Sequence, residues 1–230
     1  MGAALACYSG CTMQGWTTLD LLRHAEAEHN VGGASAIIGG GADVPLTTRG
    51  RQQAAALAAR LSREPPPVAL YSSPSRRALD TAAPLAERLR LSIVHDEALR
   101  EIGCGEVDGV PIAIVRSQYA SAWAANAAQR DPDFRWPGGE SYREFRERVV
   151  EAIRRIAAAH AGRRVVLLTH AGVISQLVGF CRSVSPACWE RHRPRNASVT
   201  RLLWHAEQGR IQRFDVEPER ANEEDASSAS

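Results

Sequence analysis

The sequence of 230 residues contains no lysine, and all 28 of its basic residues are arginine. Without lysine the chain cannot form a Schiff base with a pyridoxal-type cofactor, nor build a phosphate-binding loop of the G-x-x-x-x-G-K-[ST] kind. The protein-kinase arrangement, which needs a lysine on a strand, is excluded for the same reason. Arginine keeps its charge, and its planar guanidinium group matches the geometry of phosphate oxygens, so phosphate recognition stays open.

Paired cysteines and long apolar runs are also missing. The five cysteines are odd in number and form no C-x-x-C pair, so we expect neither a zinc site nor a disulfide framework. No apolar run approaches the roughly 20 residues that span a bilayer. A net charge of +2 is too small to predict a nucleic-acid or membrane partner. Because the first 22 residues carry no basic residue, a secretory signal is disfavoured and we expect a cytoplasmic protein.

Short apolar segments alternate with amphipathic ones along the chain. The apolar segments predict strands at 19–22, 68–71, 91–94, 164–169, 199–204 and 211–216. The segment 164–169 is almost wholly apolar, as is typical of a strand buried in a parallel sheet. Gly209 lies between the last two segments and indicates a hairpin.

Three amphipathic segments predict helices between these strands. Apolar residues recur at helical spacing in the segment from Ala54 to Leu61 and again in the segment from Ile174 to Cys181. The remaining segment, between these two, begins at the capping signature of Ser141 and Glu144 and is expected to end near Gly162. Alternating strands and helices predict a three-layer α/β/α sandwich with a mainly parallel central sheet and one antiparallel edge strand.

These patterns also divide the chain. We expect an N-terminal extension over residues 1–18, one domain over 19–216 and a disordered tail over 217–230, which is polar and lacks a core-forming pattern. The segment from Ile112 to Arg135 has weak periodicity and is interpreted as a helical insertion or lid.

Polar residues follow four of the predicted strands. They are Arg23 and His24 after the first, Ser72 to Arg77 after the second, Glu101 after the third and His170 after the fourth. Ligands in a doubly wound sheet bind beyond the carboxyl ends of the strands, so these side chains are expected to converge. Arginine forks bind phosphate oxygens, an imidazole nitrogen can attack phosphorus, and a carboxyl group can protonate the leaving oxygen. The sequence therefore predicts a phosphoryl site.

At these residues the chain resembles the histidine phosphatase superfamily, also called phosphoglycerate mutase-like. The resemblance covers about residues 18 to 216 and rests on six ordered blocks: Leu22-Arg23-His24-Ala25-Glu26 with Asn30, Asp43-Val44-Pro45-Leu46-Thr47 with Gly50, Ser73-Pro74-Ser75-Arg76-Arg77-Ala78 with Thr81, Leu99-Arg100-Glu101 with Gly105 and Gly109, Pro137-Gly138-Gly139-Glu140-Ser141, and Leu168-Thr169-His170-Ala171-Gly172. The small bacterial phosphatases of the α-ribazole phosphatase type are similar in pattern.

The resemblance implies a role for each matching residue. His24 would be the phosphorylated nucleophile and Glu101 the acid and base. Arg23, Arg77 and His170 would bind the phosphoryl oxygens with help from Asn30, and Ala171 would lie against the substrate. Arg77 is preferred over Arg76 because it directly precedes Ala78. No metal and no cofactor is implied.

Three departures from the family pattern bear on specificity. Ala25 and Ala171 stand where the family has glycine, and each adds a methyl group near the pocket. The stretch 31–42 is longer and richer in glycine than usual and lacks the basic residue often found there. The leaving group therefore stays open. The sequence does not fix the oligomeric state either, and a homodimer is one of the states it allows. Cys104 is expected to be a small buried hydrophobe, and His29 a surface or core residue.

The resulting hypothesis is a metal-independent phosphomonoesterase that acts on a small phosphorylated metabolite through a phosphohistidine. Two alternatives use the same residues. One is phosphoryl transfer of the phosphoglycerate mutase type, for which the insertion lacks a tight basic cluster. The other is a non-catalytic protein that binds a phosphorylated ligand, although neither the nucleophile nor the acid is missing.

Overall fold

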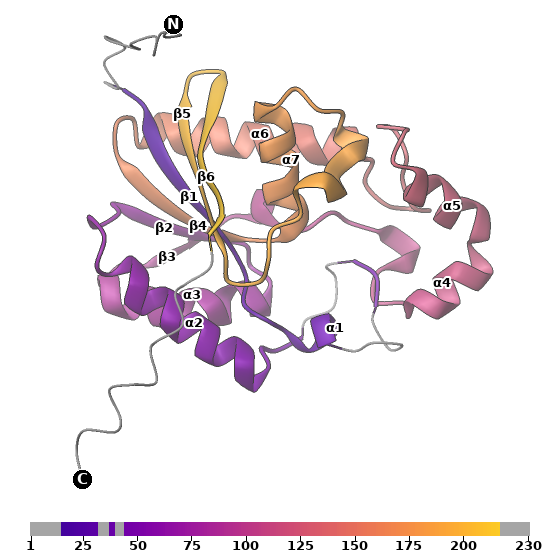
Figure 1. Ribbon diagram of the computed structural model, residues 1–230, viewed down its shortest axis with the longest axis horizontal. Coiled ribbons are helices and arrows are strands. Elements are labelled where there is room, and N and C mark those ends of the chain that lie inside the picture. Colours follow the sequence, from indigo (N-terminus) through magenta and orange to yellow (C-terminus); the bar gives the residue numbers. More distant parts are fainter. Residues whose placement is uncertain (1–14, 32–36, 40–43, 217–230) are drawn as a thin grey trace, which may run out of the picture.

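The computed structural model describes residues 15–31, 37–39 and 44–216 (Figure 1). The predicted extension lies outside the described residues up to position 14, as does the predicted tail over 217–230. The first strand begins at Thr17, so the expected extension is too long at its end. Thr17 is buried and its hydroxyl donates to the carbonyl oxygens of Ala157 and His160, which makes it part of the fold.

Six strands form one sheet in the order β3-β2-β4-β1-β5-β6. Their bounds are β1 Thr17–Arg23, β2 Ala69–Ser72, β3 Ile93–His95, β4 Arg164–Thr169, β5 Val199–His205 and β6 Gln208–Val216. β1, β2, β3 and β4 pair in parallel, whereas β5 runs antiparallel to both β1 and β6. The mainly parallel sheet is confirmed, and its antiparallel part is the β5–β6 pair at one edge.

Helices cover both faces of this sheet. α2 (Thr48–Leu61) and α3 (Arg76–Leu89) lie on the opposite side from α6 (Tyr142–Ala159) and α7 (Ala171–Cys181) (Figure 1). β4 serves both layers, because Val165 and Leu167 pack with α6 and α7 while Val166 and Leu168 pack with α2 and α3. The three-layer prediction is therefore confirmed. α3 is an additional helix beyond those predicted, and it contains Pro84, a residue that ordinarily interrupts helices.

The capping signature at the start of α6 forms as predicted. Ser141 Oγ accepts from the backbone N–H of Glu144, and the Glu144 carboxylate accepts from the backbone N–H of Ser141. The helix ends at Ala159, before the expected stop at Gly162, which adopts a positive φ of 73° in the following turn. A glycine suits that turn because it has no Cβ.

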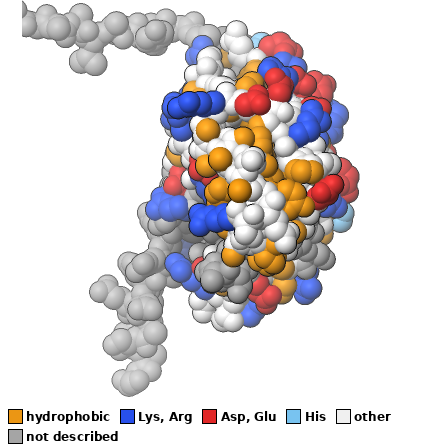
Figure 2. Space-filling model, turned by 90° about the vertical axis from the view of Figure 1, so that its right-hand side faces the viewer, with side chains coloured by type: hydrophobic (Ala, Val, Ile, Leu, Met, Phe, Trp, Pro, Cys, Tyr) orange, Lys and Arg blue, Asp and Glu red, His pale blue; other side chains and the backbone are white. Residues whose placement is uncertain are grey.

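The expected helical insertion is present as α4 (Ile112–Gln118) and α5 (Ala120–Ala128). α5 contains no fully buried residue, which explains why its apolar periodicity is weak. Both helices lie beyond the end of the sheet, as does the short α1 (Glu28–Val31) (Figure 1). The face on this side gathers hydrophobic side chains at its centre (Figure 2). None of the helices in the described ranges has the length and hydropathy of a membrane span.

An ion-pair network ties β1 to both neighbouring strands. The fully buried Asp20 carboxylate accepts from Arg164 of β4 at 2.7 Å and from Arg201 of β5 at 2.8 Å. Glu64, which follows α2, pairs with both arginines. These side chains satisfy a charge that would otherwise be costly to bury.

Candidate active site

The two predicted histidines lie side by side at the carboxyl ends of β1 and β4. These strands pair in parallel with Arg23 opposite Thr169, so the next residue of each strand leaves the sheet at the same point. The backbone N–H of His24 donates to the carbonyl oxygen of Thr169 at 2.9 Å. The ring centroids of His24 and His170 are 5.3 Å apart, and both side chains are buried.

His24 has the protonation state of a nucleophile. Its Nδ1 lies 2.8 Å from the carbonyl oxygen of Ala25, which can only accept, so Nδ1 carries the proton and Nε2 keeps its lone pair. Burial lowers the pKa of His24 well below its ordinary value, and the positive charges of Arg77 and Arg23 lower it further. The imidazole is therefore neutral at neutral pH.

His170 is held in the other tautomer. Arg77 Nη2 donates to its Nδ1 at 3.1 Å, so its Nε2 carries the proton and donates to Ser73 Oγ at 2.8 Å. Burial lowers the pKa of His170 well below its ordinary value, and the charge of Arg77 adds to this effect. His170 also begins α7 at its N-cap position, where a helix favours a bound anion.

Two buried arginines lie beside these rings. Arg77, in the first turn of α3, is 2% exposed, whereas its neighbour Arg76 is exposed and pairs with Asp80 at 3.7 Å. Arg23 donates from Nη1 to the carbonyl oxygen of Pro194 at 2.7 Å. Burial lowers the pKa of Arg23 to about 10, helped by Arg193, so it stays charged at neutral pH. Buried positive charge of this kind is suited to an anionic ligand.

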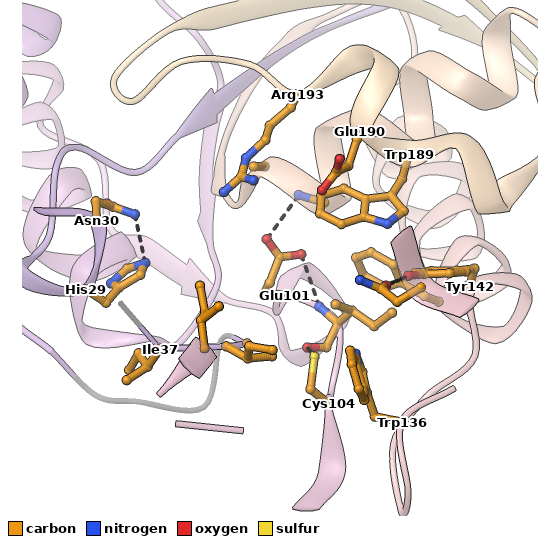
Figure 3. Close-up of a pocket in the computed structure, with 18 of the residues that line it drawn as sticks. His29, Asn30, Ile37, Glu101, Cys104, Trp136, Tyr142, Trp189, Glu190 and Arg193 are labelled. Atoms are coloured by element: carbon orange, nitrogen blue, oxygen red, sulfur yellow. Dashed lines mark hydrogen bonds between the residues drawn. The ribbon is translucent and has the colours of Figure 1, made fainter. Parts of the chain in front are cut away.

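The Glu101 carboxylate is held by two backbone amides. Oε1 accepts from Ile102 N–H at 3.1 Å and Oε2 from Gly172 N–H at 3.0 Å (Figure 3). This position depends on Gly172, because an added Cβ would lie 2.1 Å from Glu101 Oε1. Glu101 therefore reaches the site from the segment after β3 and is positioned by the first turn of α7.

Asn30 lines the site, and its oxygen is already engaged. Oδ1 accepts from the backbone N–H of Ala27 at 3.0 Å and from Asn196 Nδ2 at 3.1 Å. Asn30 Nδ2 donates to His29 Nε2 at 3.0 Å. Asn196 Nδ2 also donates to the carbonyl oxygen of His24 at 3.1 Å, so Asn196 and Asn30 together fix the segment that carries His24.

All the predicted site residues line or directly support one cavity of about 340 Å³. Arg23, His24, Asn30, Arg77, Glu101 and Ala171 line it, and His170 contacts both His24 and Arg77. Ala25 is fully buried in a neighbouring cluster instead, so only Ala171 adds a methyl group to the cavity wall. The geometry brings the residues together, and their roles remain predictions.

The cavity also contains side chains that the sequence analysis did not assign to it. His29, which was expected only as a surface or core residue, lines the cavity with its ring 5.6 Å from His24. Burial and the charges of Arg77, Arg23 and Arg193 lower the pKa of His29 to about 4. Arg193 lines the cavity too. The only sequence signal for His29 is its place five residues after His24, in the same motif.

Aromatic side chains make up another overlooked part of the lining: Trp123, Trp136, Tyr142, Phe145 and Trp189. Cys104 is buried as predicted and also lines the cavity. Burial raises the pKa of its thiol strongly, which keeps it protonated. Within the described ranges, no group of three or more histidine, cysteine, aspartate or glutamate side chains is arranged to hold a metal ion.

Comparison with known proteins agrees with this arrangement. The histidine phosphatase superfamily (branch 1) model matches residues 19–217. Phosphoglycerate mutase-like protein 4 of Arabidopsis thaliana is 34% identical over 80% of this chain and 74% of its own length. The metal-independent phosphoserine phosphatase of the same plant is 34% identical over 69% of this chain and 66% of its own.

Solved structures share the fold. Mycobacterial glucosyl-3-phosphoglycerate phosphatase in complex with VO3 superposes with a TM-score of 0.76 at 30% identity, over 87% of this chain and 99% of that one. The α-ribazole phosphatase of Shigella flexneri has a TM-score of 0.75 at 22% identity, over 86% and 96% of the two chains, which shows a common fold. The chain belongs to the histidine phosphatase superfamily. It is a phosphoric monoester hydrolase.

Proposed function

We propose that this enzyme hydrolyses a small phosphorylated metabolite without a metal, through a phosphohistidine formed on His24. The observation that carries the proposal is the neutral His24 ring, whose Nε2 lone pair is free and whose neighbours are His170 and two buried arginines. Stabilising the spread negative charge of the phosphoryl group is the main demand of this chemistry. The plant relative named a metal-independent phosphoserine phosphatase supports the absence of a metal.

In the first step, the lone pair of His24 Nε2 forms a bond to phosphorus while the bond between phosphorus and the ester oxygen breaks. Arg23 and Arg77 bind the non-bridging oxygens, and the single N–H of His170, which donates to Ser73 Oγ in the free enzyme, turns to the third of them. Glu101, in its protonated form, donates its proton to the leaving oxygen. The Nδ1–H of His24 stays bonded to the Ala25 carbonyl oxygen and stabilises the positive charge on the ring.

In the second step, a water molecule replaces the departed alcohol. The Glu101 carboxylate takes a proton from this water as its oxygen forms a bond to phosphorus and the bond to Nε2 breaks. Inorganic phosphate leaves, His24 returns to its neutral state and Glu101 is again protonated. The same carboxyl group thus serves as acid and base in turn.

The test is hydrolysis of p-nitrophenyl phosphate in EDTA, combined with rapid-quench trapping of a phosphoenzyme that is labile in acid and stable in base. We expect full activity in EDTA and a label on His24. His24→Ala should abolish both, whereas His205→Ala on β5, a histidine outside the cavity, should change neither. Activity that disappears with the chelator, or a label that survives His24→Ala, would refute the mechanism.

The alternative of a phosphoglycerate mutase is supported by the names of several relatives, among them the Arabidopsis mutase-like protein and the probable phosphoglycerate mutase of Proteus mirabilis. A mutase must bind a second anionic group of the same molecule. Beyond Arg23 and Arg77, Arg193 is the one further arginine that lines the cavity among the described residues. We therefore expect 3-phosphoglycerate to release phosphate rather than isomerise, and assays of both products decide between the two. A phosphoenzyme on His24 would exclude a non-catalytic binding protein.

A further inference from the structure

We propose that the alcohol part of the substrate carries an aromatic ring. The binding surface is an aromatic wall formed by Trp123, Trp136, Tyr142 and Trp189. This inference rests on the proposed phosphatase function, because the ester must place its phosphoryl group at His24. It adds the chemical class of the leaving group, which the residues around the phosphoryl site leave open.

The aromatic wall lies on the correct side of the acid for a leaving group. Glu101 lies between two parts of the cavity, with His29 and Asn30 on one side and Trp136, Tyr142 and Trp189 on the other (Figure 3). A phosphoryl group held at His24 would place its ester oxygen at Glu101. The carbon skeleton bonded to that oxygen then extends toward the aromatic wall.

The wall is assembled in advance by contacts among its own rings. Phe134 lies behind it and contacts Trp136 at a centroid distance of 5.4 Å and Tyr142 at 5.7 Å. Tyr142 in turn lies 6.5 Å from Trp189. Trp136 and Tyr142 are buried, so their rings are held in place. A preformed apolar surface binds a flat ring without the cost of ordering flexible side chains.

Trp123 extends the wall from the insertion. It lies on α5, and the Arg116 guanidinium of α4 stacks over its ring at 4.7 Å. Asn126, one turn further along α5, accepts a hydrogen bond from the Tyr142 hydroxyl. This bond joins the insertion to the start of α6 and keeps Trp123 on the same cavity as Tyr142.

Few polar groups remain near the wall to bind a polar alcohol. The Tyr142 hydroxyl is already bonded to the Asn126 oxygen. Two donors remain: the buried indole N–H of Trp189, which has no hydrogen-bond partner among the described residues, and the amide nitrogen of Asn126. Glu190 and Arg193 line the cavity but are exposed, so solvent screens their charges. A sugar or an amino-acid skeleton would lose water around its polar groups here and find few partners among the described residues, which is unfavourable. Aromatic rings pack well at centroid distances of about 4.5 to 7 Å.

The experiment compares esters whose leaving groups differ in shape but not in chemical activation. Benzyl, cyclohexylmethyl and ethyl phosphate are all esters of primary alcohols. We expect kcat/KM for benzyl phosphate to exceed that for ethyl phosphate by about 10- to 100-fold, and to exceed those for cyclohexylmethyl phosphate, phosphoserine and 3-phosphoglycerate. The variants Trp189→Leu and Trp123→Leu keep an apolar side chain but remove the ring.

Each of these variants should lower the ratio of benzyl to ethyl phosphate by about tenfold. Trp16→Leu is the matched control, because Trp16 packs against His205 outside the cavity, and it should leave the ratio unchanged. Thermal denaturation checks that each variant folds. Any of three results would overturn the inference. They are equal kcat/KM values for benzyl and ethyl phosphate, a preference for cyclohexylmethyl phosphate, phosphoserine or 3-phosphoglycerate, and a benzyl-to-ethyl ratio that neither tryptophan variant lowers. If no ester is hydrolysed and His24 is not labelled, the proposed function itself fails.

Discussion

Replacing Gly172 by alanine tests the position of Glu101 without changing any group that takes part in the reaction. The new Cβ would lie 2.1 Å from Glu101 Oε1 and 3.0 Å from its Cδ. Close contacts between carbon and oxygen are about 3.3 Å or longer, so the carboxyl group must move by about 1 Å. It would then lose the hydrogen bond from the Gly172 amide.

We expect a kinetic defect that depends on the leaving group. A displacement of about 1 Å in a reacting group can lower the rate about 100-fold, so kcat/KM for ethyl phosphate should fall by about that factor. The p-nitrophenolate ion leaves without a proton, so kcat/KM for p-nitrophenyl phosphate should fall less than about tenfold. The measurement is steady-state kinetics with both esters, each compared with the unchanged enzyme.

Two controls make this prediction specific. Gly179→Ala changes the same helix, but its Cβ meets only the terminal Nη2 of the Arg146 side chain, which can move, so both rates should stay near normal. Combining Gly172→Ala with Glu101→Ala should cost little beyond Glu101→Ala alone, because both changes remove the same interaction. If Gly172→Ala hydrolyses ethyl phosphate within about threefold of the normal rate, Glu101 does not act from the position described.

Three further predictions concern stability, each measured by urea unfolding. The free energy of unfolding should decrease as the pH falls from about 7 to 5, by up to about 1.4 kcal/mol per pH unit for each of His24 and His170. The reason is that the unfolded rings take up protons near pH 6.5, while burial keeps the folded rings neutral. If a His24→Ala/His170→Ala variant lost stability with falling pH just as steeply, this explanation would be wrong. Asp20→Ala should cost about 1 to 3 kcal/mol by removing the buried hydrogen-bond partner of Arg164 and Arg201, which keep Glu64, and an unchanged free energy of unfolding would refute that role. Ser141→Ala should cost about 1 kcal/mol through the cap of α6, and an unchanged midpoint would argue against the cap.

Local patterns were sufficient for much of the fold. Segment 164–169 coincides with β4, and the capping signature at Ser141 marks the start of α6, because each depends on neighbours in the chain. No helix was predicted over α3, although Ala78, Ala82 and Leu85 recur there at helical spacing and Pro84 lies within the helix. The buried face of α3 packs against the sheet, so tertiary packing accommodates the proline.

The candidate site also contains residues that the sequence pattern predicts and residues that only the tertiary structure reveals. His24, Glu101 and His170 follow strands, and the rule that parallel strands end at one edge predicts their convergence. Trp189 lies in the short 3₁₀ helix η4 (Pro186–His192) and Arg193 directly follows it, and no periodicity in the sequence places this segment beside the cavity. The contribution of such segments depends on long-range contacts, so the sequence alone could not identify the aromatic wall.

The central place of β1 has a consequence for how the enzyme is made in a cell. Its neighbours β4 and β5 both come from the last third of the chain, and Asp20 and Arg164 are separated by 144 residues. At a translation rate of about 5 to 20 residues per second, the ribosome needs roughly 7 to 30 seconds to bridge that separation. The nascent chain therefore carries the unpaired apolar strand that leads to His24 through most of its synthesis, a period in which chaperones can bind it.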